Sequence, residues 1–88
     1  MQTTLNLLEN ALKEDNNIAT WTKRLGLSGK ALYNARDRGH LSPAIAGALA
    51  EELGKDPKEW IVVAALESER ESACKTRMVS RMRKTLML

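Results

Sequence analysis

Apolar residues return every three or four positions through most of this 88-residue chain, which is the spacing of one helix face. Leu5, Leu8 and Leu12 form the first such series, and the polar run Asp15-Asn16-Asn17 interrupts it. No run of alternating β-branched residues is long enough for a strand. The pattern therefore predicts an all-α protein with five helices, which begin near residues 4, 18, 29, 43 and 57.

Glycine and capping residues mark the helix boundaries in the middle of the chain. Gly26 follows the last apolar residue of the second helix, where a left-handed backbone is commonly required. Ser28 supplies a side-chain oxygen for the free N–H groups of the third helix, which we expect to run from Gly29 to about Arg38 and to end at Gly39. These signals predict two short helices joined by a tight turn.

Two further helix starts combine a capping residue with a first-turn proline. Ser42-Pro43 opens the fourth helix, which closes at Gly54, and Asp56-Pro57 opens the fifth. One core of four or five helices is what a chain of this length can bury, so we expect no second globular domain.

The fifth helix changes character along its length. Residues 60–66 are apolar on nearly every side, whereas residues 67–72 are wholly polar. An apolar series then returns among basic residues, at Met78, Met82 and Leu86. We expect residues 1–66 to form the folded domain and residues 67–88 to form a basic, amphipathic extension of the last helix.

Charge is concentrated around the two short central helices. Between residues 20 and 40, five basic residues face one acid, giving a net charge of +4. A helical hairpin with a basic and polar outer face is how small proteins present a helix to the major groove of DNA, where each neutralised phosphate releases a counterion. Similar hairpins occur in small bundles that bind nothing, and the excess of positive charge favours DNA binding over packing alone.

Three sequence elements follow one another here: the turn Leu25-Gly26-Leu27-Ser28, then Leu32, then Arg36-Asp37-Arg38-Gly39-His40-Leu41-Ser42-Pro43. This order resembles the helix-turn-helix domain of phage repressors of the Cro/C1 type (XRE-like), over roughly residues 3–66. The resemblance implies a five-helix lambda-repressor-like DNA-binding domain, here with an extended C-terminal helix. Its third helix would be the recognition helix.

The chain departs from that family's usual pattern at three positions. Thr22 stands where a small alanine is typical, and Ala35 stands where many members carry tryptophan. Ile18 stands where a phosphate-binding glutamine is frequent, and we expect Asn17 to replace that contact.

The family's register implies roles for individual side chains. The base-facing positions would be Ser28, Gly29, Lys30, Tyr33 and Asn34. Lys30 is expected to donate to guanine and Asn34 to pair with adenine, while Tyr33 either touches sugar or a thymine methyl or is a partly buried surface aromatic. Phosphate contacts are expected from Asn17, Arg36, Arg38, His40 and Ser42.

Three hypotheses remain open for residues 67–88: a disordered basic end, a homodimer contact, or a surface for an anionic partner such as DNA backbone or membrane. Homodimerisation is favoured, and membrane binding ranks last because the apolar series is short. The expected dimer contacts are Trp60, Met78, Met82 and Leu86. Two recognition helices roughly 34 Å apart would match a pseudo-palindromic operator in double-stranded DNA.

The sequence contains few residues of the types that carry out catalysis. One His and one Cys without a third partner argue against a metal site or a nucleophilic triad, so we expect no enzyme activity, no metal and no cofactor. The unpaired Cys74 fits a reducing cytoplasm, and the apolar run at residues 60–66 is far too short to span a bilayer. We expect a cytoplasmic, nucleoid-associated protein of a bacterial host.

Two function classes stay open. The first is a transcriptional regulator, which by the resemblance would be a phage or prophage repressor occupying an operator as a dimer. The second is an antitoxin or an accessory protein-interaction module with incidental DNA binding. Residues 41–69 sum to −4 and residues 70–88 to +5, so the acidic block separates two basic regions. If both lie on one side of the fold they form one DNA footprint, and otherwise the tail serves another partner.

Overall fold

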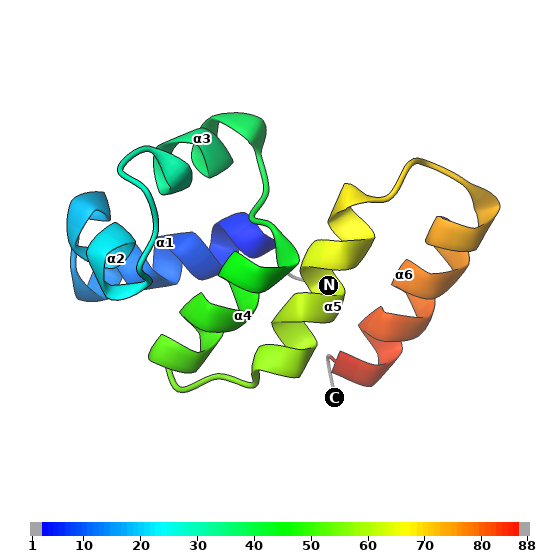
Figure 1. Ribbon diagram of the computed structural model, residues 1–88. Coiled ribbons are helices and arrows are strands. Elements are labelled where there is room, and N and C mark those ends of the chain that lie inside the picture. Colours follow the sequence, from blue (N-terminus) through cyan, green and yellow to red (C-terminus); the bar gives the residue numbers. More distant parts are fainter. Residues whose placement is uncertain (1–2, 87–88) are drawn as a thin grey trace.

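Six helices account for all the regular secondary structure in residues 3–86, the part of the chain that this computed structural model describes (Figure 1). They are α1 (Thr4–Glu14), α2 (Ile18–Arg24), α3 (Ala31–Arg38), α4 (Pro43–Glu52), α5 (Pro57–Ser68) and α6 (Ala73–Leu86). The prediction of an all-α protein is confirmed, and the number of helices is one more than expected.

Local capping chemistry sets most of the helix ends. Thr3 and Asn6 form a reciprocal capping box at the start of α1. The Ser42 hydroxyl accepts a hydrogen bond from the Ile45 amide (3.4 Å), and the Asp56 carboxylate accepts one from the Lys58 amide (3.0 Å), as their positions before proline predicted. The three glycines expected to end helices all have a left-handed backbone: Gly26, Gly39 and Gly54.

The start of α3 differs from the prediction. The helix begins at Ala31 rather than at Gly29, and Lys30 occupies the N-cap position without a side-chain hydrogen bond. Ser28 does not cap the helix, because its backbone carbonyl closes a turn with the Ala31 amide (3.1 Å) before the helix begins. Ser28 and Gly29 therefore lie exposed in the connection between α2 and α3.

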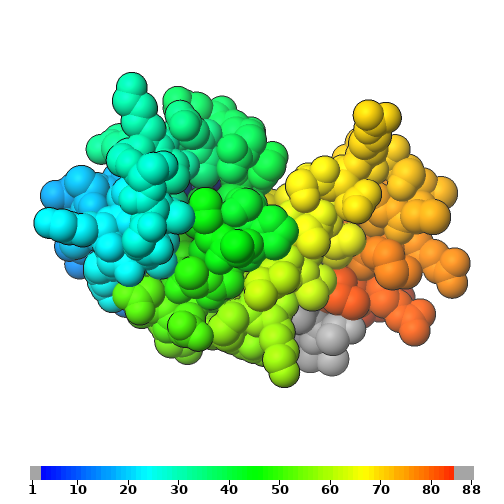
Figure 2. Space-filling model, viewed as in Figure 1, coloured from blue at the N-terminus to red at the C-terminus, as the bar shows by residue number. Residues whose placement is uncertain are grey.

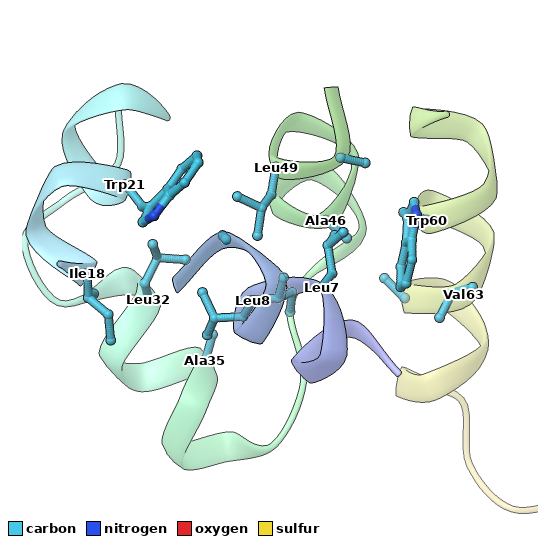
Figure 3. Close-up of a cluster of buried hydrophobic side chains, with 14 residues drawn as sticks. Leu7, Leu8, Ile18, Trp21, Leu32, Ala35, Ala46, Leu49, Trp60 and Val63 are labelled. Atoms are coloured by element: carbon cyan, nitrogen blue, oxygen red, sulfur yellow. The ribbon is translucent and has the colours of Figure 1, made fainter. Parts of the chain in front are cut away.

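The core is built around α1. Figure 3 shows Leu7 and Leu8 of α1 between side chains of α2 and α3 on one side and of α4 and α5 on the other. Trp21 of α2 is fully buried, and its indole N–H donates to the Asp15 carbonyl (2.9 Å), so its polar atom is satisfied. Trp60 is also part of this core.

Helices α4 and α5 lie against each other at Gly47. A Cβ atom at Gly47 would lie 2.8 Å from Cγ1 of Ile61, which is closer than real contacts allow. Glycine at this position thus lets the backbone of α4 lie against the side chain of Ile61.

The C-terminal segment does not extend the fifth helix, which corrects the prediction. The chain leaves α5 at Glu69 in an extended conformation (φ −73°, ψ 148°). The Ser72 hydroxyl then accepts a hydrogen bond from the Lys75 amide (3.0 Å), so Ser72 caps a new helix. Helix α6 runs back antiparallel beside α5 (Figure 1).

Candidate nucleic-acid interface

Helices α2 and α3 form a hairpin whose connection is fixed by backbone hydrogen bonds. The Gly26 amide donates to the Lys23 carbonyl (3.1 Å), and the Leu27 amide donates to the Thr22 carbonyl (3.0 Å). These two bonds satisfy carbonyl groups that the end of α2 would otherwise leave free. Helix α3 then lies along one edge of the molecule (Figure 1).

Two fully buried side chains hold α3 on the core. Leu32 and Ala35 have no exposed surface, and they lie on the inner side of the helix (Figure 3). Because side chains three or four positions apart share a helix face, Tyr33, Asn34 and Arg36 are directed outward. All three are exposed, as the sequence predicted.

The outer face of α3 carries donors that are free to bind a ligand. Within residues 3–86, the side chains of Lys30 and Asn34 have no hydrogen-bond partner. Tyr33 is 40% exposed, and the Arg36 guanidinium carbon lies 5.5 Å from its ring centroid, within the range of a cation–π contact. Tyr33 is therefore a surface residue that helps to orient Arg36.

The residues expected to contact phosphate divide into two groups. Asn17 caps α2, with its side-chain oxygen accepting from the Ala19 amide (3.0 Å), which leaves its NH₂ group as a donor. Arg36 and Arg38 are exposed, although Arg38 also donates to the His40 carbonyl (3.3 Å). These three side chains keep donors directed at solvent.

His40 and Ser42 are more involved in the fold. Ser42 uses its hydroxyl to cap α4. His40 is half-buried, and its Nδ1 atom is buried with no partner among residues 3–86. Both residues lie in the α3–α4 connection, and the structure gives them less access to a ligand than the sequence suggested.

The position of Arg24 differs from the expectation that its charge belongs to the basic outer surface of the hairpin. Its guanidinium lies 4.1 Å from the Trp21 ring centroid, and its Nε atom lies 3.1 Å from a carboxylate oxygen of Glu52. Arg24 therefore joins α2 to the end of α4. Its charge is paired within the fold and contributes less to any outer surface.

The two basic regions of the chain lie on different sides of α4 and α5, and they come nearest where Gly39 and His40 line a pocket with Lys75 and Val79 of α6. Figure 1 places α4 and α5 between the α2–α3 hairpin and α6, and Figure 2 shows the two regions at opposite ends of the molecule. Lys75, the first basic residue of α6, also pairs with Glu71 (2.8 Å). The basic side chains of α3 and α6 therefore do not form one continuous surface.

The residues expected to form a dimer contact are also divided. Trp60 is 6% exposed and belongs to the core, which corrects its assignment to an interface, because it shares the buried face of α5 with Val63 and Ala64. Met78 is exposed and Met82 is half-buried, while the side chain of Leu86 lies outside the described part of the structure. Helix α5 instead exposes Ile61 and Val62.

The described residues form neither a metal-binding cluster nor a membrane-spanning helix. No group of three His, Cys, Asp or Glu side chains there is arranged to hold a metal ion. None of the described helices is both long and apolar enough to cross a membrane. The free Cys74 is exposed near the start of α6.

Comparison with known proteins found no match to the chain among family models, curated proteins or solved structures.

Proposed function

We propose that this protein is a sequence-specific transcriptional regulator of the Cro/C1 type, with a lambda-repressor-like fold, that inserts α3 into the major groove of double-stranded DNA. The observation that carries the proposal is the two-sided character of α3. Leu32 and Ala35 are completely buried, while Tyr33, Asn34 and Arg36 are exposed on the opposite side. A helix held rigidly with free donors outward meets the requirement for reading base edges.

The outward side chains match the chemistry of the groove. Lys30 would donate to the O6 or N7 atom of guanine, and Asn34 would pair with the N6 and N7 atoms of adenine. Ser28 and Gly29 would lie close to the bases. Because Ser28 does not cap α3, its hydroxyl is available to form a hydrogen bond with a base. Tyr33 would contact a sugar or a thymine methyl group while holding Arg36.

Phosphate contacts would position the hairpin on the duplex. The NH₂ group of Asn17 and the guanidinium groups of Arg36 and Arg38 are the donors best placed for this role, because they are exposed. His40 and Ser42 would contribute less directly, by fixing the loop that follows α3.

A homodimer acting on a pseudo-palindromic operator remains part of the proposal. The apolar side chains that support it are Ile61 and Val62 on α5 and Met78 on α6, each more than a third exposed. Association between subunits would cover apolar side chains such as these. Occupation of the operator would then repress transcription, as the resemblance to phage repressors implies.

The test begins with a duplex selected by the protein from a random pool. The wild-type protein is titrated against the selected duplex and a scrambled one at two salt concentrations, with mass measured by light scattering. We expect a dimer that binds the selected duplex at least about a thousandfold more tightly than the scrambled one. Equal, weak and strongly salt-dependent binding to both would contradict the proposal and favour a protein-interaction module.

A further inference from the structure

Thr4 lies at the centre of a hydrogen-bond chain that joins distant parts of the sequence. Its side chain is completely buried at the first turn of α1. The Thr4 hydroxyl donates to Oε1 of Glu67 at the end of α5, and it accepts a hydrogen bond from the Leu41 amide (2.8 Å). The Thr4 amide also donates to Oε2 of Glu67 (3.0 Å). Three separate segments therefore meet at one hydroxyl group.

The chemistry of these groups fixes the direction of each bond. A hydroxyl has one proton to donate, and an ionised carboxylate can only accept. Because Glu67 takes the hydroxyl proton of Thr4, the lone pairs of that oxygen are left for the Leu41 N–H. The carboxylate also satisfies the Thr4 amide, one of the N–H groups that the start of a helix leaves without a partner. Glu67 thereby orients Thr4 for its contact with Leu41.

Leu41 anchors the loop that follows α3. It lies three residues after the last residue of α3, is completely buried, and follows the left-handed Gly39. Its amide would be a buried donor without a partner if Thr4 were turned away, which is a costly arrangement. The turn after α2 fixes the beginning of α3, and the contact between Leu41 and Thr4 fixes the loop at its other end.

From these contacts we infer that Glu67 is a positioning residue for α3, acting through Thr4 on the α3–α4 loop. The effect on DNA recognition rests on the function proposed above. The effect on the loop itself can be measured without DNA. Glu67 lies outside the α2–α3 hairpin, so its influence on base selectivity would be indirect.

Three variants test this inference. Glu67→Gln keeps the side-chain shape, but it offers one acceptor oxygen to two donors and turns an NH₂ group toward the other. Thr4→Val keeps the shape of Thr4 and removes the hydroxyl, whereas Thr4→Ser retains it. The matched control is Glu69→Gln, which removes the same charge two residues away from an exposed side chain.

The first readout is the ratio of affinities for the selected and scrambled duplexes, measured under conditions where each variant is folded. We expect Glu67→Gln and Thr4→Val to lower this ratio about tenfold, the effect of one mismatched base pair, with the affinity for the scrambled duplex changed less than about twofold. Thr4→Ser and Glu69→Gln should keep the wild-type ratio. An unchanged ratio in Glu67→Gln, or equal losses in Thr4→Ser and Thr4→Val, would overturn the inference.

The second readout is hydrogen exchange of the Leu41 amide in the free protein. We expect exchange at least about tenfold faster in Glu67→Gln and Thr4→Val than in the wild type, because each variant weakens the partner of this amide. If the wild type selects no DNA sequence, the proposed function is wrong. The positioning role of Glu67 is then tested by the exchange of the Leu41 amide alone. Wild-type protection of Leu41 in Glu67→Gln would then overturn it.

Discussion

Helices α3 and α6 are both basic and lie on the surface, but they are held in different ways. From Lys30 to Arg38, three basic residues and one acid give a net charge of +2, whereas α6 carries five basic residues and no acid. Helix α3 is anchored by the completely buried Leu32 and Ala35, and none of the side chains described for residues 73–84 of α6 is buried. The more basic helix is thus the less firmly attached one.

This difference shows that charge alone does not identify the helix that reads a sequence. Attraction to phosphate requires only positive charge, and it operates at any surface of the molecule. Selection among bases also requires that donors be held at fixed positions, which only an anchored helix provides. The anchoring of α3 therefore supports its proposed role better than its charge does.

Removing the anchor of α3 should have the largest effect. We expect Leu32→Ala to lower the free energy of unfolding by about 2–5 kcal/mol, because it leaves a cavity at a fully buried position. The matched change Val79→Ala on α6 should lower it by less than about 1 kcal/mol, since Val79 is half-buried. Urea unfolding of both variants measures the difference. Equal losses would mean that α6 is held as firmly as α3.

The outer face of α3 gives the next largest effect. We expect Lys30→Ala and Asn34→Ala each to reduce discrimination against the scrambled duplex by about 1–3 kcal/mol while salt-dependent background binding persists. Arg83→Ala is the control, since it removes an exposed basic residue from α6 rather than from the hairpin. The measurement is a duplex titration at two salt concentrations. Loss of all binding in the folded Lys30 and Asn34 variants would count against their base-reading roles.

The two glycines flanking α3 offer a sharper comparison. Gly39 has a left-handed backbone (φ 97°), so Gly39→Ala should lower the free energy of unfolding by about 1–2 kcal/mol. Gly29 lies outside that region, and an added Cβ would meet no atom within 4 Å. Gly29→Ala should therefore change stability by less than about 0.5 kcal/mol. Thermal unfolding compares the two variants, and similar losses would show that the ends of α3 are equally constrained.

The smallest effect is expected at the start of α6. Ser72→Ala removes the cap on the Lys75 amide, which is worth about 1 kcal/mol to the helix itself. Because α6 contributes no buried side chain over residues 73–84, the change should increase exchange of its amides while leaving sequence selectivity intact. Exchange measured by NMR separates α6 from the rest. A parallel loss of selectivity would show that α6 is coupled to α3.

Local signals predicted most of the fold. Gly26, Gly39 and Gly54 end helices where the sequence placed them, and the prolines at 43 and 57 follow caps. These features depend on a few neighbouring residues, so a single sequence reveals them. The exposed face of α3 was predictable for a similar reason, since the spacing of Leu32 and Ala35 defines which side points inward.

Two predictions were wrong although the sequence pattern contained evidence against them. Ser72 ends the polar run after α5 and is a favourable N-cap residue, which indicates a new helix rather than a continuous one. Trp60 shares one face of α5 with Val63 and Ala64, at a spacing that places it in the core. Its aromatic character suggested an interface, although its position on the helix indicated burial.

Other features depend on contacts between distant residues and could not be predicted from local patterns. The pairing of Arg24 with Glu52 spans 28 positions, and it changes how much charge the hairpin presents. The position of α6 on the far side of α5 depends on the reversal at Glu69, and only that position separates the two basic regions. Tertiary packing decides these features after the helices form.

The hydrogen bond between Thr4 and Glu67 joins residues that are synthesised at different times, because they are separated by 63 positions. A nascent chain that contains α1 to α4 already has every residue of the α2–α3 hairpin. It still lacks the carboxylate that orients Thr4 toward Leu41. On the ribosome, the α3–α4 loop therefore acquires its final geometry only after α5 has been synthesised.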